Sequence, residues 1–140
     1  MLLISVSMFL GSILTNSYEI QNFVSSNVGE YFPFWMMIIL LPLLVWCFSL
    51  IGVHPIITSA PILSIFGPLL TVWEAAFLMQ AHLIGWCTGT AISFTSLSVL
   101  TGAENFKISA SKLVFGPNLF ATLGLVLFGA LFLILLNYFL

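Results

Sequence analysis

The chain has 140 residues, 61% of them hydrophobic, and its charged side chains are four glutamates and two lysines. A soluble domain normally has about a quarter of its residues charged, so this composition predicts an integral membrane protein in contact with the lipid bilayer. The net charge of −2 comes with neither a basic patch nor an acidic tail, and no nucleic-acid partner is expected.

The N-terminal region combines a short apolar run with a polar connection. Residues 2–14 lack the basic start and the small-residue cleavage site of a signal peptide, so they predict a first, short membrane helix. Residues 19–32, EIQNFVSSNVGEYF, then favour a segment at the membrane interface. Tyr31 and Trp35 are aromatic anchors of the kind found at the level of the lipid headgroups.

The next segment is apolar from Phe34 to Leu70, a run of 37 residues. One unbroken helix of that length would measure about 55 Å, whereas the hydrocarbon core of a bilayer is about 30 Å thick. Pro33–Leu50 is predicted to be a span, within which Pro42 is tolerated. The stretch IGVHPIITSAPI follows, and its glycine, histidine and prolines predict that the run turns back or is interrupted there.

A second polar interruption follows the apolar segment AAFLMQAHLIGW. Hydroxyl residues and a glycine occupy seven of eleven positions, namely Thr88, Gly89, Thr90, Ser93, Thr95, Ser96 and Ser98. Small hydroxyl residues also occur where membrane helices pack closely. Their density here favours a lining for an ion or a substrate, because irregular backbone at membrane depth has to face protein or a water-filled cavity.

The C-terminal third contains both lysines and a final span. Residues 103–116 carry Lys107 and Lys112 and predict an amphipathic connection at the interface. Leu119–Leu140 predicts the terminal span. The positive-inside tendency places the lysine connection in the cytoplasm and the C-terminus outside, with a bacterial inner membrane as the expected location.

The expected fold is an all-α integral membrane protein, one domain over residues 1–140. It would have about four to five transmembrane segments, two of them discontinuous or re-entrant. Residues near 51–56 and 88–94 are expected to be non-helical and to face one another or a common cavity. Broken helices expose N–H groups that favour anions and carbonyl groups that favour cations such as Na⁺.

The order of these elements resembles the C-terminal half of ion transporter superfamily proteins, such as divalent anion/sodium symporters and the large membrane subunits of TRAP transporters. In the sodium–dicarboxylate members a Ser-Asn-Thr motif occupies the first break, where this chain has GVHPIITS, and the second break here is TGTAIS. Those transporters consist of two inverted repeats that together form the binding sites. The resemblance therefore implies that this chain supplies one repeat and that a second copy or a separate subunit supplies the other.

The resemblance implies a half-transporter, or a transporter subunit, for a small anion such as a carboxylate, driven by a Na⁺ or H⁺ gradient. Eight residues at the two breaks are the candidate substrate and ion ligands: Gly52, His54, Pro55, Thr58, Thr88, Gly89, Thr90 and Ser93. Glycine and proline would hold the backbone open, and the hydroxyls and freed carbonyls would coordinate cation and substrate. Histidine changes charge near neutral pH, so His54 is a candidate proton carrier.

Two other functions fit the same sequence. The chain can be a non-catalytic membrane subunit or assembly partner, in which the breaks serve packing alone. It can also be a small redox subunit with His54 and His82 as axial haem ligands. The simplest interpretation of His82 is a hydrogen bond between helices. An enzyme is not expected, because no nucleophile triad, carboxylate pair or phosphate loop is present, and Cys47 and Cys87 form no metal-binding or disulfide motif.

Overall fold

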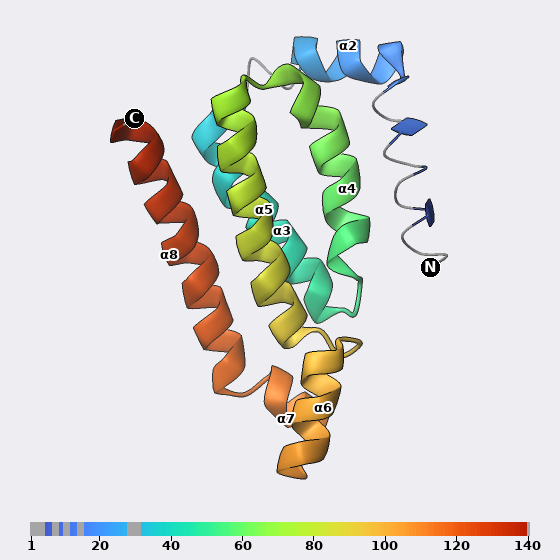
Figure 1. Cartoon of the computed structure of the whole chain (residues 1–140), viewed down its shortest axis with the longest axis vertical. Helices are drawn as coiled ribbons and strands as arrows, with labels where there is room; N and C mark the ends of the chain where they lie inside the picture. Colours follow the sequence, from blue (N-terminus) through green and yellow to red (C-terminus); the bar gives the residue numbers. More distant parts are fainter. Residues whose placement is uncertain (1–4, 7–8, 10–11, 14–15, 28–31, 140) are drawn as a thin grey trace.

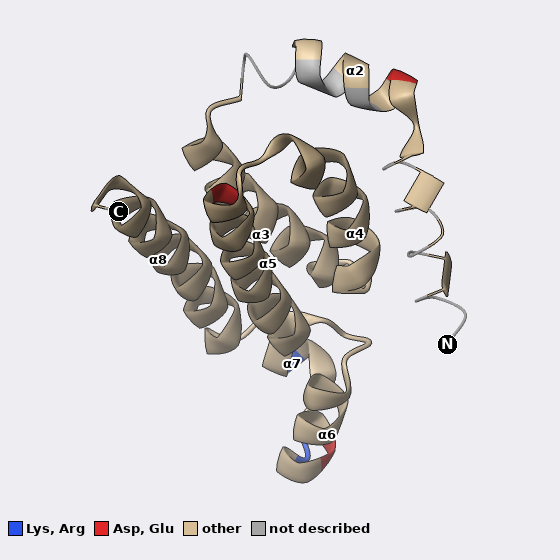
Figure 2. Cartoon of the chain, turned by 45° about the horizontal axis from the view of Figure 1, so that its top comes forward, with Lys and Arg blue, Asp and Glu red and all other residues tan. Residues whose placement is uncertain are grey.

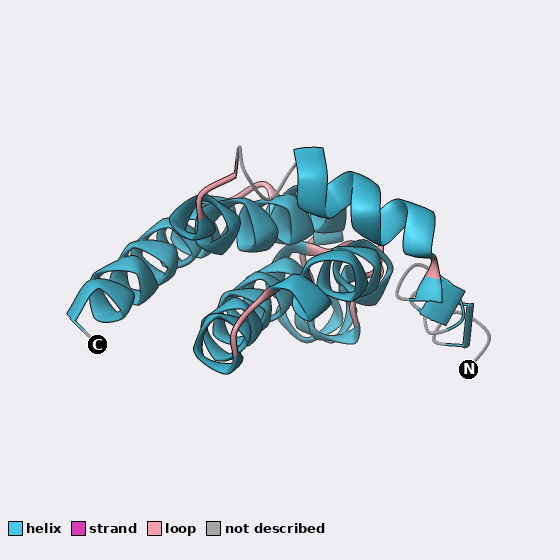
Figure 3. Ribbon diagram, turned by 90° about the horizontal axis from the view of Figure 1, so that it is seen from above, coloured by secondary structure: helices cyan, strands magenta, loops and turns pink. Residues whose placement is uncertain are grey.

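The computed structural model describes residues 5–6, 9, 12–13, 16–27 and 32–139, and in these residues it contains helices and turns but no strand (Figure 3). The expected all-α fold is therefore confirmed. Among these described residues, two helical stretches are long and apolar enough to cross a membrane: Val72–Phe106, which is interrupted at residues 93–96, and Pro117–Phe139. Most of the expected first span at 2–14, and the interfacial residues Glu30 and Tyr31, lie outside the described residues.

Four helices run along the long axis of the molecule, and shorter helices lie at its two ends (Figure 1). The long-axis helices are α3 (Phe34–Leu50), α4 (Pro55–Phe66), α5 (Val72–Ile92) and α8 (Pro117–Phe139). Helix α2 (Tyr18–Asn27) lies across one end, and the 3₁₀ turn η1 (Gly67–Leu69) joins α4 to α5. Helices α6 (Leu97–Phe106) and α7 (Ala110–Val114) lie at the opposite end, which we call the lysine end.

Local sequence signals set the ends of the helices around the first turn and the start of α5. Pro55 occupies the first position of α4, where its missing N–H costs nothing. At the start of α5, Thr71 Oγ1 accepts from Glu74 N at 3.3 Å, and the Glu74 carboxylate accepts from Thr71 N at 2.9 Å. This capping box accounts for Glu74 as a helix-start residue.

Helices α3 and α5 pack at very close range because α5 presents two glycines to α3. A Cβ added at Gly85 would lie 2.7 Å from Pro42 Cα, and one added at Gly89 would lie 2.5 Å from Ser49 Oγ. Gly85 and Gly89 form a small-xxx-small pair, a pattern that lets membrane helices approach backbone to backbone. The sequence prediction assigned Gly89 to a broken backbone, whereas in the structure it is a packing residue.

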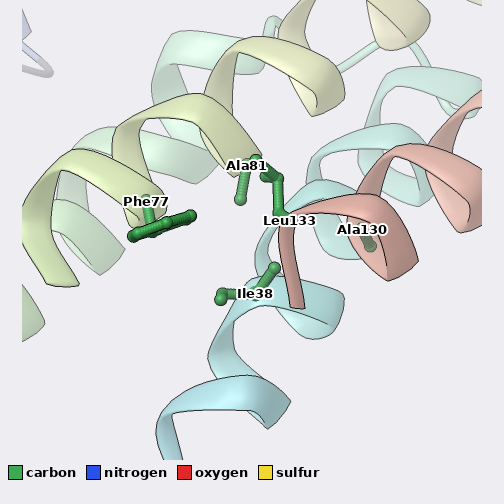
Figure 4. Packing of buried hydrophobic residues seen from close by; sticks show 5 residues of the cluster. All are labelled: Ile38, Phe77, Ala81, Ala130 and Leu133. Carbon is green, nitrogen blue, oxygen red and sulfur yellow. The ribbon is translucent and has the colours of Figure 1, made fainter. Parts of the chain in front are cut away.

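The core links α3, α5 and α8. Figure 4 shows one cluster of buried side chains from these three helices: Ile38, Phe77, Ala81, Ala130 and Leu133. Towards the lysine end, the indole N–H of Trp46 on α3 donates to Thr122 Oγ1 on α8 at 3.0 Å, and both side chains are buried. Apolar packing and this hydrogen bond together hold α8 against the other long helices.

Charged side chains gather at the two ends of the long axis (Figure 2). Glu19 lies in the first turn of α2 and Glu74 in the first turn of α5, at one end. Glu104 on α6, Lys107 directly after α6 and Lys112 on α7 lie at the lysine end. Helices α3, α4 and α8 carry no charged residue, and α5 carries none after its first turn.

The structure confirms the first predicted interruption for residues 51–54, although Pro55 and Ile56 are already helical, and it relocates the second. The long apolar run turns back at residues 51–54, between α3 and α4, so α4 returns alongside α3. Helix α5 continues through Thr88, Gly89 and Thr90 to Ile92, so the prediction of a non-helical 88–92 is wrong. The second turn comprises residues 93–96, and both turns lie toward the lysine end rather than midway along the bundle (Figure 1).

Hydroxyl hydrogen bonding explains why α5 does not break at its threonines. Thr88 Oγ1 donates to the carbonyl of Ile84 at 2.6 Å, and Thr90 Oγ1 donates to the carbonyl of Cys87 at 3.0 Å. A threonine in a helix can satisfy its hydroxyl on the preceding turn, so the side chains require no unwinding of the backbone.

Candidate functional site

The two turns touch each other. Gly52 has a φ of +84°, a conformation that glycine adopts without strain. Its carbonyl accepts a long hydrogen bond from Thr95 Oγ1 in the second turn, at 3.4 Å. Thr95 Oγ1 also lies 3.0 Å from the hydroxyl of Ser93, which is buried. The expectation that residues near 51–56 and 88–94 face one another is thus met only at the edge of the second stretch, where Thr95 contacts Gly52.

His54 forms the N-cap of α4. Its Nδ1 atom accepts a hydrogen bond from Ile56 N at 3.3 Å, and the side chain is exposed. Pro55 is buried directly after it, and Thr58 is half-buried one turn further into α4. The first group of predicted ligands therefore contains a capped helix start, in which the N–H of Ile56 is already used.

Both histidines of the chain contact the same tryptophan. The His54 and Trp86 rings have centroids 5.6 Å apart, the His82 and Trp86 rings 5.5 Å, and both pairs are nearly perpendicular. We call His54, Trp86 and His82 the histidine–tryptophan cluster. Trp86 was not among the predicted site residues, although its spacing of four residues from His82 puts the two on one face of a helix.

His82 is buried without the hydrogen bond that was its simplest interpretation. Only 7% of its surface is exposed, and among the described residues its Nδ1 atom has no hydrogen-bond partner. A buried polar atom left unpaired costs on the order of 1–3 kcal/mol. The prediction of a satisfied interhelical hydrogen bond is therefore wrong at Nδ1.

The second group of predicted ligands is divided between packing and a pocket. Thr88 is buried, and Gly89 packs against Ser49 of α3. Thr90 instead lines an open pocket of about 500 Å³ where α5, α6, α7 and α8 meet, which we call the junction pocket. Its lining is Cys87, Thr90, Ala91, Ser98, Val99, Leu113 and Asn118.

Side chains from α6 and α8 cap the end of α5 at this pocket. Ser98 Oγ donates to the carbonyl of Thr90 at 3.2 Å, and Asn118 Nδ2 donates to the carbonyl of Ala91 at 2.6 Å. These are carbonyls of the last turn of α5, which have no partner within the helix. Sequence reasoning did not select Asn118, and its only sequence signal is a polar residue at the start of an otherwise apolar span.

No charged side chain lines the junction pocket, and its polar side chains Ser98 and Asn118 lie at the ends of helices. Ser98 lies in the first turn of α6 and Asn118 in the first turn of α8, so the positive ends of two helix dipoles adjoin the pocket. The C-terminal end of α5 contributes the opposite polarity. Within the described residues no group of three His, Cys, Asp or Glu side chains could hold a metal ion. The hydroxyl and amide groups that line the pocket can form hydrogen bonds with a small polar solute.

No protein-family model matches the chain, and neither do curated proteins or solved structures. The features of the chain that bear on function are the two turns, the histidine–tryptophan cluster and the junction pocket.

Proposed function

We propose that the chain is an integral membrane protein and one half of a secondary transporter for a small anion, with a carboxylate as the expected substrate. The observation that carries this proposal is the junction pocket. It places hydroxyl, amide and thiol groups beside two helix N-termini in a chain whose residues are 61% hydrophobic. Helix N-termini and neutral donors favour anions without holding them too tightly to be released.

The distribution of charge supports the membrane part of this proposal. Helix α5 has 21 residues, about 32 Å at the α-helical rise, which matches a hydrocarbon core of about 30 Å. Glu74 at one end and Lys112 at the other would then lie at opposite surfaces of the bilayer. In this arrangement α3, α4, α5 and α8 are four spans, of which α3 and α4 are shorter than α5 and α8, and α2 lies in the interface.

The donors in the pocket suit a carboxylate. The Asn118 amide carries two N–H groups, and the carbonyl of Ala91 uses one of them. Thr90 and Ser98 contribute hydroxyls, which can turn toward a bound anion. Lys112 on the neighbouring α7 gives the lysine end positive charge that would attract an anion from the cytoplasm.

The resemblance to the ion transporter superfamily supports the proposal that the chain is one half of a transporter. A repeat working alone would have its site open toward the missing repeat, and the junction pocket is an open one. The outer face of α8 is rich in exposed aromatic and aliphatic residues, among them Phe120, Phe128 and Phe132. Such a face fits lipid and a second subunit or second copy of the chain equally well.

Gradient-driven uptake tests the proposal. The chain would be reconstituted in liposomes, alone and with each candidate partner encoded next to it, and uptake of a labelled dicarboxylate measured under Na⁺ and H⁺ gradients. Thr90→Val should lower uptake about tenfold or more, because it removes a hydrogen bond to a charged solute. Thr101→Val, the same change at an exposed position of α6, should leave uptake unchanged. Uptake that no assembly supports, or that Thr90→Val leaves intact, overturns the assignment.

A non-catalytic membrane subunit is the second candidate, favoured by the capping of the helix ends. The carbonyls of Thr90 and Ala91 and the N–H of Ile56 all have protein partners. Under this function the pocket has no solute, so dicarboxylates would not raise the thermal stability of the purified chain. A rise in midpoint temperature that Thr90→Val abolishes would exclude it.

A further inference from the structure

One face of α5 is left uncovered by the rest of the described chain, and its residues follow the repeat of a contact between two helices. Trp73, Ala76, Gln80, Leu83 and Cys87 are all exposed, and none of them belongs to the buried residues of α5. Successive members are alternately three and four residues apart, which is the spacing of the residues that meet where two helices pack along each other. We call these five residues the α5 seam.

The α5 seam lies in a groove between α5 and α8, which run side by side (Figure 1). A pocket of about 390 Å³ is lined by the part of the seam from Gln80 to Cys87 and by α8 residues such as Phe128. A second pocket, of about 370 Å³, is lined by the part from Trp73 to Gln80 and by α8 residues such as Phe132. Gln80 lines both pockets, so they adjoin there. From residue 73 to residue 87 a helix rises about 21 Å, which is long enough for a second helix to lie along the groove.

Gln80 puts an amide in the middle of this groove. It lies eight residues after Val72, about 12 Å along a helix of about 32 Å, and so inside the hydrocarbon core if α5 spans the membrane as proposed. Its side chain is exposed, and its amide has no hydrogen-bond partner within the described part of the chain. Lipid tails cannot supply one, and an unpaired amide in hydrocarbon is unfavourable. The partner of Gln80 must therefore come from outside this chain.

The Gln80 of a second copy complements this amide. A carboxamide has both an N–H donor and a carbonyl acceptor, so two of them that face each other across a two-fold axis can donate to each other. A single polar residue in an apolar seam also fixes which residues of the two helices meet. The lysines favour the same orientation for every copy. In such a parallel pair, Cys87 of one copy would lie opposite Cys87 of the other.

We propose that two copies of the chain pair in parallel along the α5 seam, with their Gln80 amides hydrogen-bonded to each other and with α8 of each copy beside the contact. The pair rests on the membrane setting of the proposed function, and it names a second copy of the chain as a partner. The α5 seam also reaches the junction pocket, because Cys87 lines both that pocket and the groove. A second copy seated on the seam therefore lies at the edge of the junction pocket.

Energy transfer between donor-labelled and acceptor-labelled full-length chains in liposomes measures the pairing as the protein is diluted with lipid. Gln80→Leu should weaken the pair about tenfold, because it removes both hydrogen bonds between the copies. Gln80→Asn keeps an amide and should preserve most of the pairing. Asn137→Leu removes an exposed amide of α8 that is not part of the seam, and it should leave the pairing unchanged. These side chains are exposed in the single chain, so its fold does not depend on them.

Oxidative crosslinking tests which residues of the two copies meet. Cys47 on α3 and Cys87 on α5 are both free and exposed. Copper phenanthroline added to membranes that contain the chain should join two copies through Cys87. Cys87→Ser should abolish the crosslinked dimer, whereas Cys47→Ser should not affect it. A dimer that requires Cys47 instead would overturn the contact along α5.

The outcomes separate the pair from the proposed transport function. Single copies at every protein-to-lipid ratio would mean that lipid covers the groove, and they would overturn the pair. Pairing that Gln80→Leu leaves as tight as in the wild type would overturn it as well. Pairing in a chain that supports no uptake would establish the contact and remove the transporter. Uptake by a wild-type chain that stays single would overturn the pair, while the transporter stands.

Discussion

The contact between α3 and α5 at Gly85 allows a prediction whose size follows from the geometry. A Cβ at this position would lie 2.7 Å from Pro42 Cα and 3.1 Å from the Pro42 carbonyl oxygen. Both atoms belong to the backbone, so no side-chain rotation can relieve the overlap, and α3 and α5 must separate. Overpacking of this kind costs about 1–3 kcal/mol. Replacing glycine by alanine inside a helix returns about 1 kcal/mol through helix propensity.

Gly124→Ala is the matched control for Gly85→Ala. Gly124 lies in α8, and a Cβ there would have no atom within 4 Å. The gain in helix propensity is common to both variants, so the difference between them isolates the overlap, and we expect Gly85→Ala to be less stable than Gly124→Ala by about 1–3 kcal/mol. Reversible unfolding in mixed micelles of mild detergent and SDS gives both free energies. Equal free energies for the two variants would refute the close approach of α3 and α5.

Three further predictions concern a hydrogen bond, a backbone angle and the orientation in the membrane. Trp46→Phe removes the indole N–H that Thr122 accepts and should cost about 1 kcal/mol in the same unfolding assay. Gly52→Ala puts a side chain at a φ of +84° and should lower the free energy of unfolding by about 1–2 kcal/mol. An unchanged free energy would show that residue 52 does not have this backbone conformation. If the chain spans a membrane as proposed, cysteines replacing Glu74 and Lys112 should react with an impermeant thiol reagent from opposite sides of sealed vesicles.

The reversal after α3 was predictable because its determinants are local. Gly52 supplies the left-handed residue of the turn, and Pro55 supplies a favourable first residue for α4. The length of the apolar run required a reversal or a break somewhere, and these residues located it. The same logic predicted the helices at 33–50 and 119–140 to within a few residues, since apolar helices of that length have recognisable ends.

The second break was misplaced because its determinants are not local. Threonine hydroxyls can satisfy themselves on their own helix or line a cavity, and the sequence does not distinguish these outcomes. The role of Gly89 depends on Ser49, forty residues earlier, and on how closely α3 approaches. The junction pocket likewise depends on Asn118 reaching back to the carbonyl of Ala91. The small-xxx-small spacing of Gly85 and Gly89 indicates close helix packing but does not identify the partner helix, and the contact of Asn118 has no signature in the sequence.

Helix α5 presents its features on successive faces, and this arrangement limits how the protein can move. Gly85 and Gly89 face α3, His82 and Trp86 lie next to them around the helix, and Thr90 faces the junction pocket. Rotating or sliding α5 against α3 would force the glycines out of register at a contact that has no spare room. Helix α8 is also held against the other long helices, by the hydrogen bond from Trp46 to Thr122 and by the packing of Gly129 against Ile84. Motion at the pocket is therefore expected in the short helices α6 and α7, which meet the end of α5 through Ser98.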